Sequence, residues 1–169
     1  MSTSIRITVT VPESILRSDF MREQIMQKMR EKTGPDLRKE FMKTVDGWEG
    51  KPEFSQKFTN SISGLSTEVF PSGANRSTYE LVNAGSPPHT IRAKNGRGLL
   101  RFQTGYRAAT RPRVVGSRAK SRFGDTISAP MVRHPGFVAR EFDMVIAEQY
   151  QNTFEDDMQD AINAGARRK

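Results

Sequence analysis

The sequence predicts an α+β fold in which a small antiparallel sheet packs against N-terminal and C-terminal helices, with a long basic loop. Three observations lead to this fold class. Apolar residues alternate with polar ones near the N-terminus and again in the middle of the chain, as in half-buried strands. Apolar residues recur at spacings near 3.6 in two other stretches, as in amphipathic helices. Between Leu81 and Gly124 the chain carries ten basic residues and no acidic one.

Residues 1–52 are expected to form a strand followed by helices. Apolar side chains occupy every second position at Ile5, Ile7, Val9 and Val11. This alternation predicts a strand that ends at Pro12. Pro12 then begins a helix, because the first turn tolerates proline, and the helix continues to about Lys32. Thr33-Gly34-Pro35 is expected to interrupt it, and a second helical stretch follows at 36–45.

Residues 53–104 are expected to form the antiparallel sheet. Short alternating pieces predict strands at 54–62, 65–70, 78–83 and 98–104. Gly, Pro, Ser and Asn residues separate these pieces, as expected for turns.

Residues 105–129 are predicted to be a long basic loop or an extended hairpin, because they contain few large apolar side chains. A loop longer than about 12–15 residues usually has a function or is disordered. We expect its basic side chains to contact a partner protein or DNA: Arg107, Arg111, Arg113, Arg118, Lys120 and Arg122.

Residues 130–169 are predicted to form a final strand or turn and the C-terminal helix. Apolar side chains follow at steps of four after His134-Pro135-Gly136, at Phe142, Ile146, Tyr150, Phe154, Met158 and Ile162. A step of four advances by more than one turn, so the apolar stripe winds around the helix. The helix should therefore pack across more than one neighbour.

The chain has 169 residues, which suits a single domain, 1–169. It contains no cysteine, which excludes disulfides and thiolate metal sites. It also lacks the apolar core of a signal peptide and the roughly 20 apolar residues of a membrane span. We therefore expect a soluble protein with no membrane association.

Charge is distributed unevenly along the chain. Residues 81–124 contribute +10, whereas the whole chain carries +8, so the remainder is slightly acidic. This segregation indicates a surface that meets a polyanion or an acidic partner subunit. The alternative is a solvated charged face, in which acidic residues would normally be interspersed.

Few residues offer catalytic chemistry. There is no cysteine nucleophile and no Gly-x-Ser-x-Gly elbow, and His89 and His134 flank prolines without metal-ligand spacing. The acidic residues of the C-terminal helix, Glu155, Asp156, Asp157 and Asp160, are expected to form a solvated face. Residues 95–98, Asn-Gly-Arg-Gly, lack the Gly-Lys-Ser/Thr ending of a phosphate loop. We therefore expect no enzyme activity, cofactor or metal.

A nucleic-acid-binding module is the main alternative from a different class of protein. Phe102, Tyr106 and Phe123 interleave with arginines, as on a single-strand binding platform, and residues 91–122 hold the basic run. The chain shows no helix-turn-helix, RNP or zinc signature, so such binding would be non-specific. The aromatic residues are at least as well explained as strand and loop anchors.

Four pieces of the sequence occur in a family-like order: residues 79–86, 91–94, 99–102, and 132–137 ahead of 140–142. Together they resemble the tail-component family of lambdoid-type tailed phages. In that family a strand and turn with Tyr and Gly precede two strands, and a Val-x-His-Pro-Gly turn opens the C-terminal helix. The matching structural positions are Tyr79, Gly85, Lys94, Leu99, Phe102, His134, Pro135 and Gly136. Gly85 and Gly136 are expected to supply backbone conformations that other residues resist, and Pro135 to fix the turn into the helix. This chain departs from the family in a more elaborate N-terminal region and a longer, more basic 105–129 connection.

The resemblance implies a structural virion protein of the neck or tail, a head-tail joining or tail-completion subunit that is assembled in the host cytoplasm. It implies a homo-oligomeric ring, hexameric or dodecameric, between the portal or connector and the tail tube. The adjoining proteins would be neck, connector, tail-tube or tail-terminator proteins. The basic loop would face phage DNA in the lumen or dock on an acidic neighbouring ring.

Overall fold

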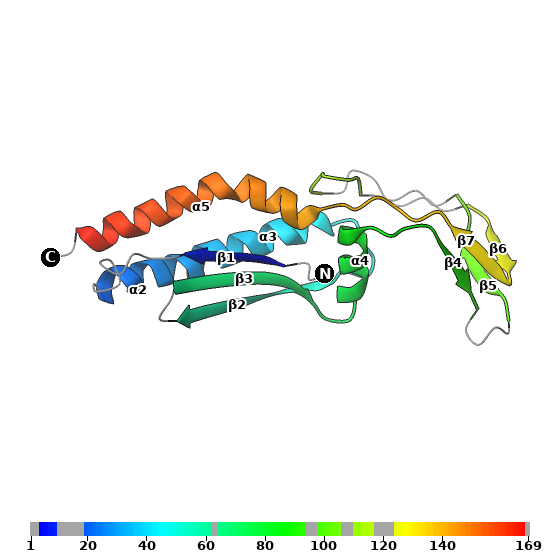
Figure 1. Ribbon diagram of the computed structural model, residues 1–169, viewed down its shortest axis with the longest axis horizontal. Helices are drawn as coiled ribbons and strands as arrows, with labels where there is room; N and C mark the ends of the chain where they lie inside the picture. Colours follow the sequence, from blue (N-terminus) through cyan, green and yellow to red (C-terminus); the bar gives the residue numbers. More distant parts are fainter. Residues whose placement is uncertain are drawn as a thin grey trace.

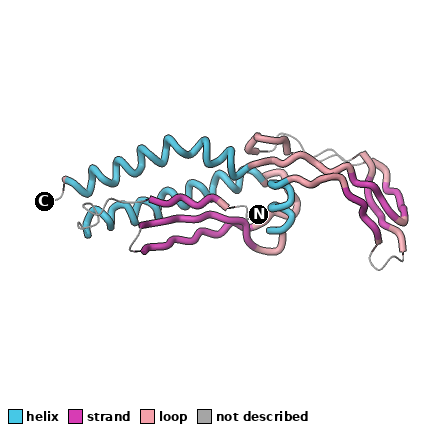
Figure 2. The backbone as a smooth tube through the Cα atoms, in the orientation of Figure 1, coloured by secondary structure: helices cyan, strands magenta, loops and turns pink. Residues whose placement is uncertain are grey.

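The computed structural model describes residues 4–9, 19–61, 64–93, 98–105, 110–116 and 124–167. The molecule is elongated (Figure 1): helices and a three-stranded sheet form a body, and short strands form an arm at the end far from the C-terminus. Figure 2 shows that helices are confined to the body, whereas the arm consists of strands and loops. The predicted α+β class with antiparallel sheets and terminal helices is confirmed.

The body sheet contains β1 (Ile5–Val9), β2 (Glu53–Ser61) and β3 (Gly64–Ser72). The order is β1-β3-β2 and both pairs are antiparallel. Alternate β3 residues are buried, at Leu65, Thr67, Val69 and Pro71. This face packs against the helices, so the alternating pattern correctly predicted the strands expected at 54–62 and 65–70.

A single helical rod follows β1, formed by α2 (Asp19–Lys28), the π-helical turn η1 (Met29–Thr33) and α3 (Gly34–Thr44). The expectation that residues 33–35 interrupt the helix was wrong. The Gly34 N–H donates to the Met29 carbonyl across a wider turn, and proline then sits in the first turn of α3, where its missing N–H leaves no bond broken. The predicted helix start at Pro12 lies outside the described residues.

Helix α5 (Phe142–Ala166) runs antiparallel to this rod (Figure 1) and contacts both α2 and α3. Of the apolar residues at steps of four, Phe142, Ile146, Tyr150 and Met158 are buried and Phe154 and Ile162 are half-buried, as expected for a helix that packs across more than one neighbour. Asp157 corrects the expectation of a fully solvated acidic face: it is only 3% exposed, and it pairs with Lys32 and, at 3.5 Å, with Lys28 of the rod. These ion pairs join α5 to the rod.

Residues 76–84 form a helix, α4 (Arg76–Ala84), so the strand predicted at 78–83 was wrong. Tyr79 and Asn83 lie one helical turn apart and are both buried. The Tyr79 ring packs among aromatic rings from three other elements, including Phe54 at 5.1 Å and Phe142 at 5.9 Å between ring centroids. Burial of this face explains why residues with high β propensity adopt a helix.

The arm contains β4 (His89–Arg92), β5 (Leu100–Gln103), β6 (Thr126–Ala129) and β7 (Met131–His134). Strand β4 pairs with β7, and β5 pairs with β6, both antiparallel. Residues 53–104 therefore do not form one sheet. Residues 105–129 were expected to form a long basic loop or an extended hairpin, and within them residues 126–129 form strand β6, which pairs with β5. The final strand and C-terminal helix expected in 130–169 are present as β7 and α5.

Candidate interaction arm

The arm, defined as residues 87–93, 98–105 and 124–135, consists of two antiparallel ribbons in series. In one ribbon Ile91 lies opposite Val132, and in the other Phe102 lies opposite Ile127. Strands β6 and β7 are separated only by Pro130, which has no N–H to donate to a ladder. Each ribbon thus extends for only a few residue pairs.

Each ribbon has one apolar and one polar face, because side chains alternate across a strand. The apolar face of β5–β6 carries Leu100, Phe102, Ile127 and Ala129. The polar face of β4–β7 carries Thr90, Arg92, Met131 and Arg133. Arg92 and Arg133 are diagonal neighbours on that polar face, since Thr90 opposes Arg133 and Arg92 opposes Met131.

No side chain of the four arm strands is buried. Large apolar side chains are instead exposed, including Leu99 at 63% and Met131 at 53%. A two-stranded ribbon is marginally stable by itself, and apolar surface left in water is a typical feature of interaction sites. The arm therefore has the properties of a surface that another molecule covers.

The arm strands hold three arginines, Arg92, Arg101 and Arg133, and no acidic residue. Within the described part of the chain, none of these guanidinium groups has a carboxylate within ion-pair distance. Their charge is therefore available to an acidic partner.

The junction, residues 82–86 and 136–143, joins the arm to the body. Ser86 and Phe137 exchange two backbone hydrogen bonds of 3.0 and 2.9 Å. Gly85 and Gly136 have φ angles of 76° and 77°, as their predicted role as conformationally permissive residues requires. A Cβ atom at Gly85 would lie 2.6 Å from the Ala139 nitrogen, and one at Gly136 would overlap the Ser86 carbonyl.

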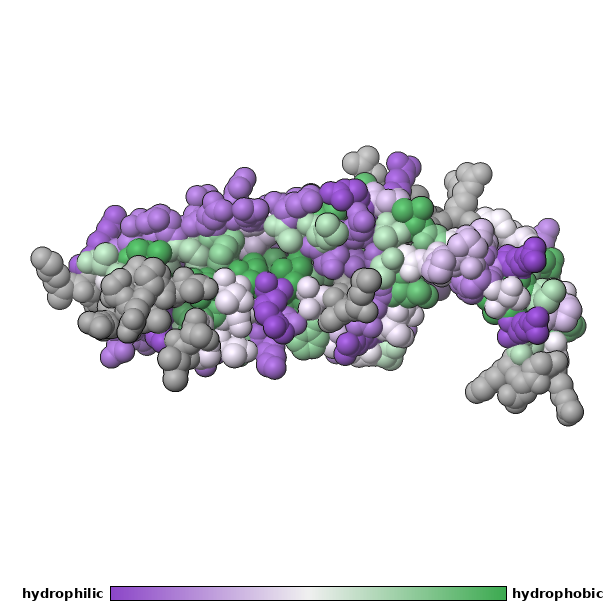
Figure 3. All heavy atoms as spheres, in the orientation of Figure 1, coloured by the Kyte–Doolittle hydropathy of each residue, from purple (hydrophilic) through white to green (hydrophobic). Residues whose placement is uncertain are grey.

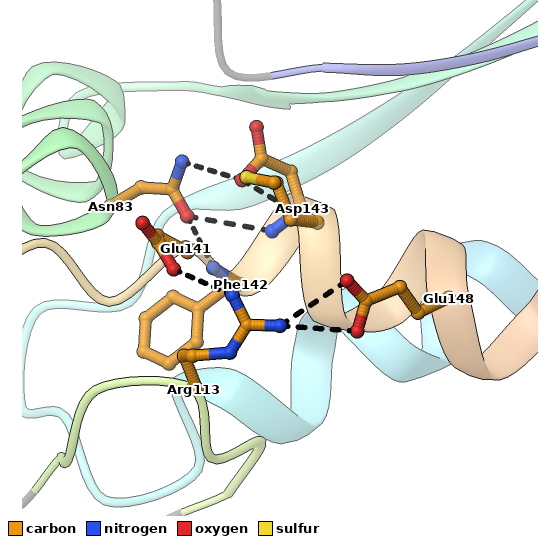
Figure 4. A network of polar contacts seen from close by, with 7 residues as sticks. Asn83, Arg113, Glu141, Phe142, Asp143 and Glu148 are labelled. Carbon is orange, nitrogen blue, oxygen red and sulfur yellow. Dashed lines mark hydrogen bonds and ion pairs between the residues drawn. The ribbon is translucent and has the colours of Figure 1, made fainter.

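Asn83 anchors the start of α5 to α4 (Figure 4). Its Oδ1 accepts a hydrogen bond of 2.7 Å from the Phe142 N–H, and its Nδ2 donates to Asp143 at 2.9 Å. The backbone carbonyl of Asn83 also accepts from the Glu141 N–H. Glu141 occupies the N-cap position of α5 but makes no side-chain capping bond. Asn83, a residue of α4, provides that cap instead.

Residues 110–116 of the predicted basic loop pack on the junction. Arg113 donates to Glu141 at 3.0 Å and to Glu148 at 3.2 Å (Figure 4). The carboxylate of Glu148, more than that of Glu141, raises the pKa of Arg113. Buried Thr110 accepts a hydrogen bond from Arg140, and Val115 packs against the body core. Arg113 therefore contacts this chain's own α5.

The predicted site residues lie in different places. Among the predicted basic contacts, Arg111 is exposed and Arg113 is paired, whereas Arg107, Arg118, Lys120 and Arg122 lie outside the described residues. Among the motif residues, Tyr79 is a core residue, and Lys94 lies outside the described residues. Leu99 and Phe102 belong to the arm, with Phe102 half-buried.

The remaining motif residues meet at the base of the arm. His134 stacks on His89 with ring centroids 5.0 Å apart. Gly136 lies against the backbone of Ser86 and Pro87, which follow Gly85. Pro135 does not lead directly into a helix, because an extended segment separates it from Phe142. The sequence interpretation missed Asn83 and Arg133; periodicity gives no signal for a cap supplied by a distant residue.

Within the described ranges, no three His, Asp or Glu side chains gather as a metal site requires. No described helix is both long and apolar enough to cross a membrane. The chain matches no known family, no curated protein and no solved structure.

Proposed function

We propose that this protein is a structural virion subunit of a tailed bacteriophage, a neck or tail-completion protein that forms a ring between the connector and the tail tube. The observation that carries the proposal is where the family-like motifs lie. Pieces more than 40 residues apart, around Gly85 and His134-Pro135-Gly136, meet at the base of one arm. Such agreement between separate motifs is expected when they specify one structural feature.

The shape of the molecule supports an assembly role. The body has its own core, formed by two clusters of buried side chains. The arm adds exposed apolar and basic surface to that body without burying any strand side chain. A ring subunit needs such surface to hold its neighbours, and needs no catalytic group.

Cryo-electron microscopy of purified particles that contain this protein tests the proposal. We expect a ring of density between the connector and the tail tube that accommodates the body and the arm, with six or twelve copies. Particles that lack the protein in this position would contradict the proposal.

Non-specific nucleic-acid binding is the second candidate, and the unpaired arginines of the arm favour it. It predicts that the isolated protein binds duplex DNA with an affinity that falls steeply as salt rises, because phosphate contacts release counterions. Fluorescence anisotropy with a labelled duplex measures this. Salt-sensitive DNA binding, together with absence of the protein from mature particles, would favour this candidate.

A further inference from the structure

We infer that the arm of one copy docks on the acidic outer face of α5 of a second copy, so that the chains associate head to tail. This inference names the interface of the proposed ring and rests on the proposed function for its biological setting. The two surfaces carry opposite charges. The arm strands are purely basic, whereas α5 contains six acidic residues and no basic one: Asp143, Glu148, Glu155, Asp156, Asp157 and Asp160.

Part of the α5 charge is already neutralised within the chain. Asp157 pairs with the lysines of the rod, Glu148 pairs with Arg113, and Asp160 lies 3.8 Å from Lys28. Glu155 and Asp156 are exposed and have no basic partner among the described residues. They form an acidic surface on the C-terminal half of the helix, and Figure 3 shows hydrophilic side chains along the outer edge of α5.

The two surfaces of one copy cannot meet each other. Asp156 lies 14 residues into α5, which places it about 20 Å along the helix from the junction at 1.5 Å per residue. The arm extends from the junction in the opposite direction (Figure 1). Complementary surfaces at opposite ends of a subunit make a heterologous contact, which closes into a ring when the rotation between subunits allows it.

A protein surface suits the arm better than nucleic acid does. Met131 is exposed on the same face as Arg92 and Arg133, and Leu99 is exposed nearby along the chain. Interfaces with DNA are more polar and more positively charged than this mixture. Apolar side chains interspersed with arginine are typical of protein interfaces.

Charge reversal on each surface tests the contact. One variant carries Arg92→Glu with Arg133→Glu, and the other carries Glu155→Lys with Asp156→Lys. We expect sedimentation velocity at low ionic strength to show self-association of the wild type, and a dissociation constant at least about tenfold weaker for each variant. An equimolar mixture of the two variants should associate again, because each reversed surface then meets a complementary one.

The matched controls are Arg38→Glu and Glu49→Lys, which reverse exposed charges outside the arm strands and α5. These should associate as the wild type does. A wild type that stays monomeric at high concentration and low salt would overturn the inference, as would a mixture that fails to associate. Loss of duplex DNA binding in the arm variant, with no change in self-association, would assign the arm to nucleic acid instead.

The two proposals can fail separately. If particles contain the protein as a ring but the mixed variants do not associate, the interface is wrong and the function stands. If the mixed variants associate but no particle contains the protein, the interface stands and the function is wrong.

Discussion

Gly136 sets how closely the two segments of the junction approach each other. Its φ of 77° is costly for other residues, and a methyl group there would overlap the Ser86 carbonyl. Gly136→Ala should therefore lower the free energy of unfolding by roughly 2–4 kcal/mol, since a left-handed conformation and overpacking both contribute. Urea denaturation followed by circular dichroism measures the change.

Gly98→Ala provides the matched control. Gly98 also has a positive φ, of 101°, but an added methyl group would meet no described atom within 4 Å. Gly98→Ala should therefore lower the free energy of unfolding by only about 1 kcal/mol, because it changes the backbone preference without crowding. Equal losses in the two variants would show that crowding at the junction is unimportant.

Asn83 provides a second test at the level of single residues. Asn83, which is 6% exposed, is the side-chain acceptor for the Phe142 N–H and a donor to the Asp143 carboxylate, and Asn83→Ala removes both bonds while the Met144 N–H still binds Asp143. We expect a loss of about 1–3 kcal/mol in the free energy of unfolding, measured in urea. Asn75→Ala is the control, because Asn75 precedes α4 without a side-chain capping bond, and it should change stability by less than about 0.5 kcal/mol.

The sequence predicted the two junction glycines but not the cap. A glycine beside a turn signal points to a special backbone conformation, and that reasoning applied to both Gly85 and Gly136. Asn83 stands in the last turn of a short helix, where nothing local suggests a hydrogen bond to Phe142, 59 residues later. Contacts that depend on tertiary proximity leave no periodic signal in one sequence.

At the scale of elements, Tyr79 links α4 to the core and predicts a dependence on alkaline pH. Burial raises the pKa of Tyr79 above its ordinary value and raises that of Tyr150 to about 12. Tyrosines of the unfolded chain ionise near pH 10. The contribution of the two buried tyrosines to the free energy of unfolding is therefore fully present below pH 10, and it is lost as the pH rises toward the pKa values of the folded state. Tyr79 alone should account for a loss on the order of 1 kcal/mol in the free energy of unfolding at pH 11.

Tyr79→Phe tests this contribution. The variant loses only the 3.2 Å hydrogen bond between the Tyr79 and Thr44 hydroxyls, while the Thr44 hydroxyl keeps its bond to the Phe41 carbonyl. Urea titrations at pH 8 and pH 11 should show a smaller drop in stability for the variant than for the wild type. A drop of the same size in both proteins would show that Tyr79 ionises without unfolding the core.

Elements with a strong period were predicted well, and elements governed by packing were not. The alternation in β2 and β3 and the apolar row in α5 identified those elements correctly. The segment 77–82 favours a strand by propensity. It is nevertheless helical, because a helix buries Tyr79 and Asn83, which lie one turn apart. Likewise, the π-helical turn before Pro35 keeps the rod continuous, whereas local rules place a break there.

At the scale of the whole molecule, the separation of body and arm was not predictable from periodicity. The arm strands are short alternating pieces, like those of the body, and a sequence does not show which pieces pair with each other. The pairing of β4 with β7 joins residues about 40 positions apart, and it divides the expected single sheet into three. The basic charge of the region was visible in the sequence, but its distribution over two ribbons was not.

The structure predicts that the body folds without the arm. All buried apolar side chains of the two core clusters lie outside residues 87–136, and among the described residues of that range only Val115 packs on them. Ser86 and Phe137 form a hydrogen-bonded antiparallel pair, which a two-residue Asn-Gly turn closes in a type I′ hairpin. Replacing residues 87–136 with Asn-Gly should therefore preserve the body.

We expect this shortened chain to unfold cooperatively in urea, with a stability loss of about 1–3 kcal/mol from the missing Thr110 and Val115 contacts. Trp48 is the single tryptophan, and its ring centroid lies 6.0 Å from that of Tyr79, so its fluorescence reports on the core. The shortened chain should also fail to self-associate, whereas the same turn with Ala-Ala, which disfavours the hairpin, should fold less stably. A body that folds on its own core should unfold cooperatively without the arm. Loss of the cooperative Trp48 transition would therefore show that arm and body form one folding unit.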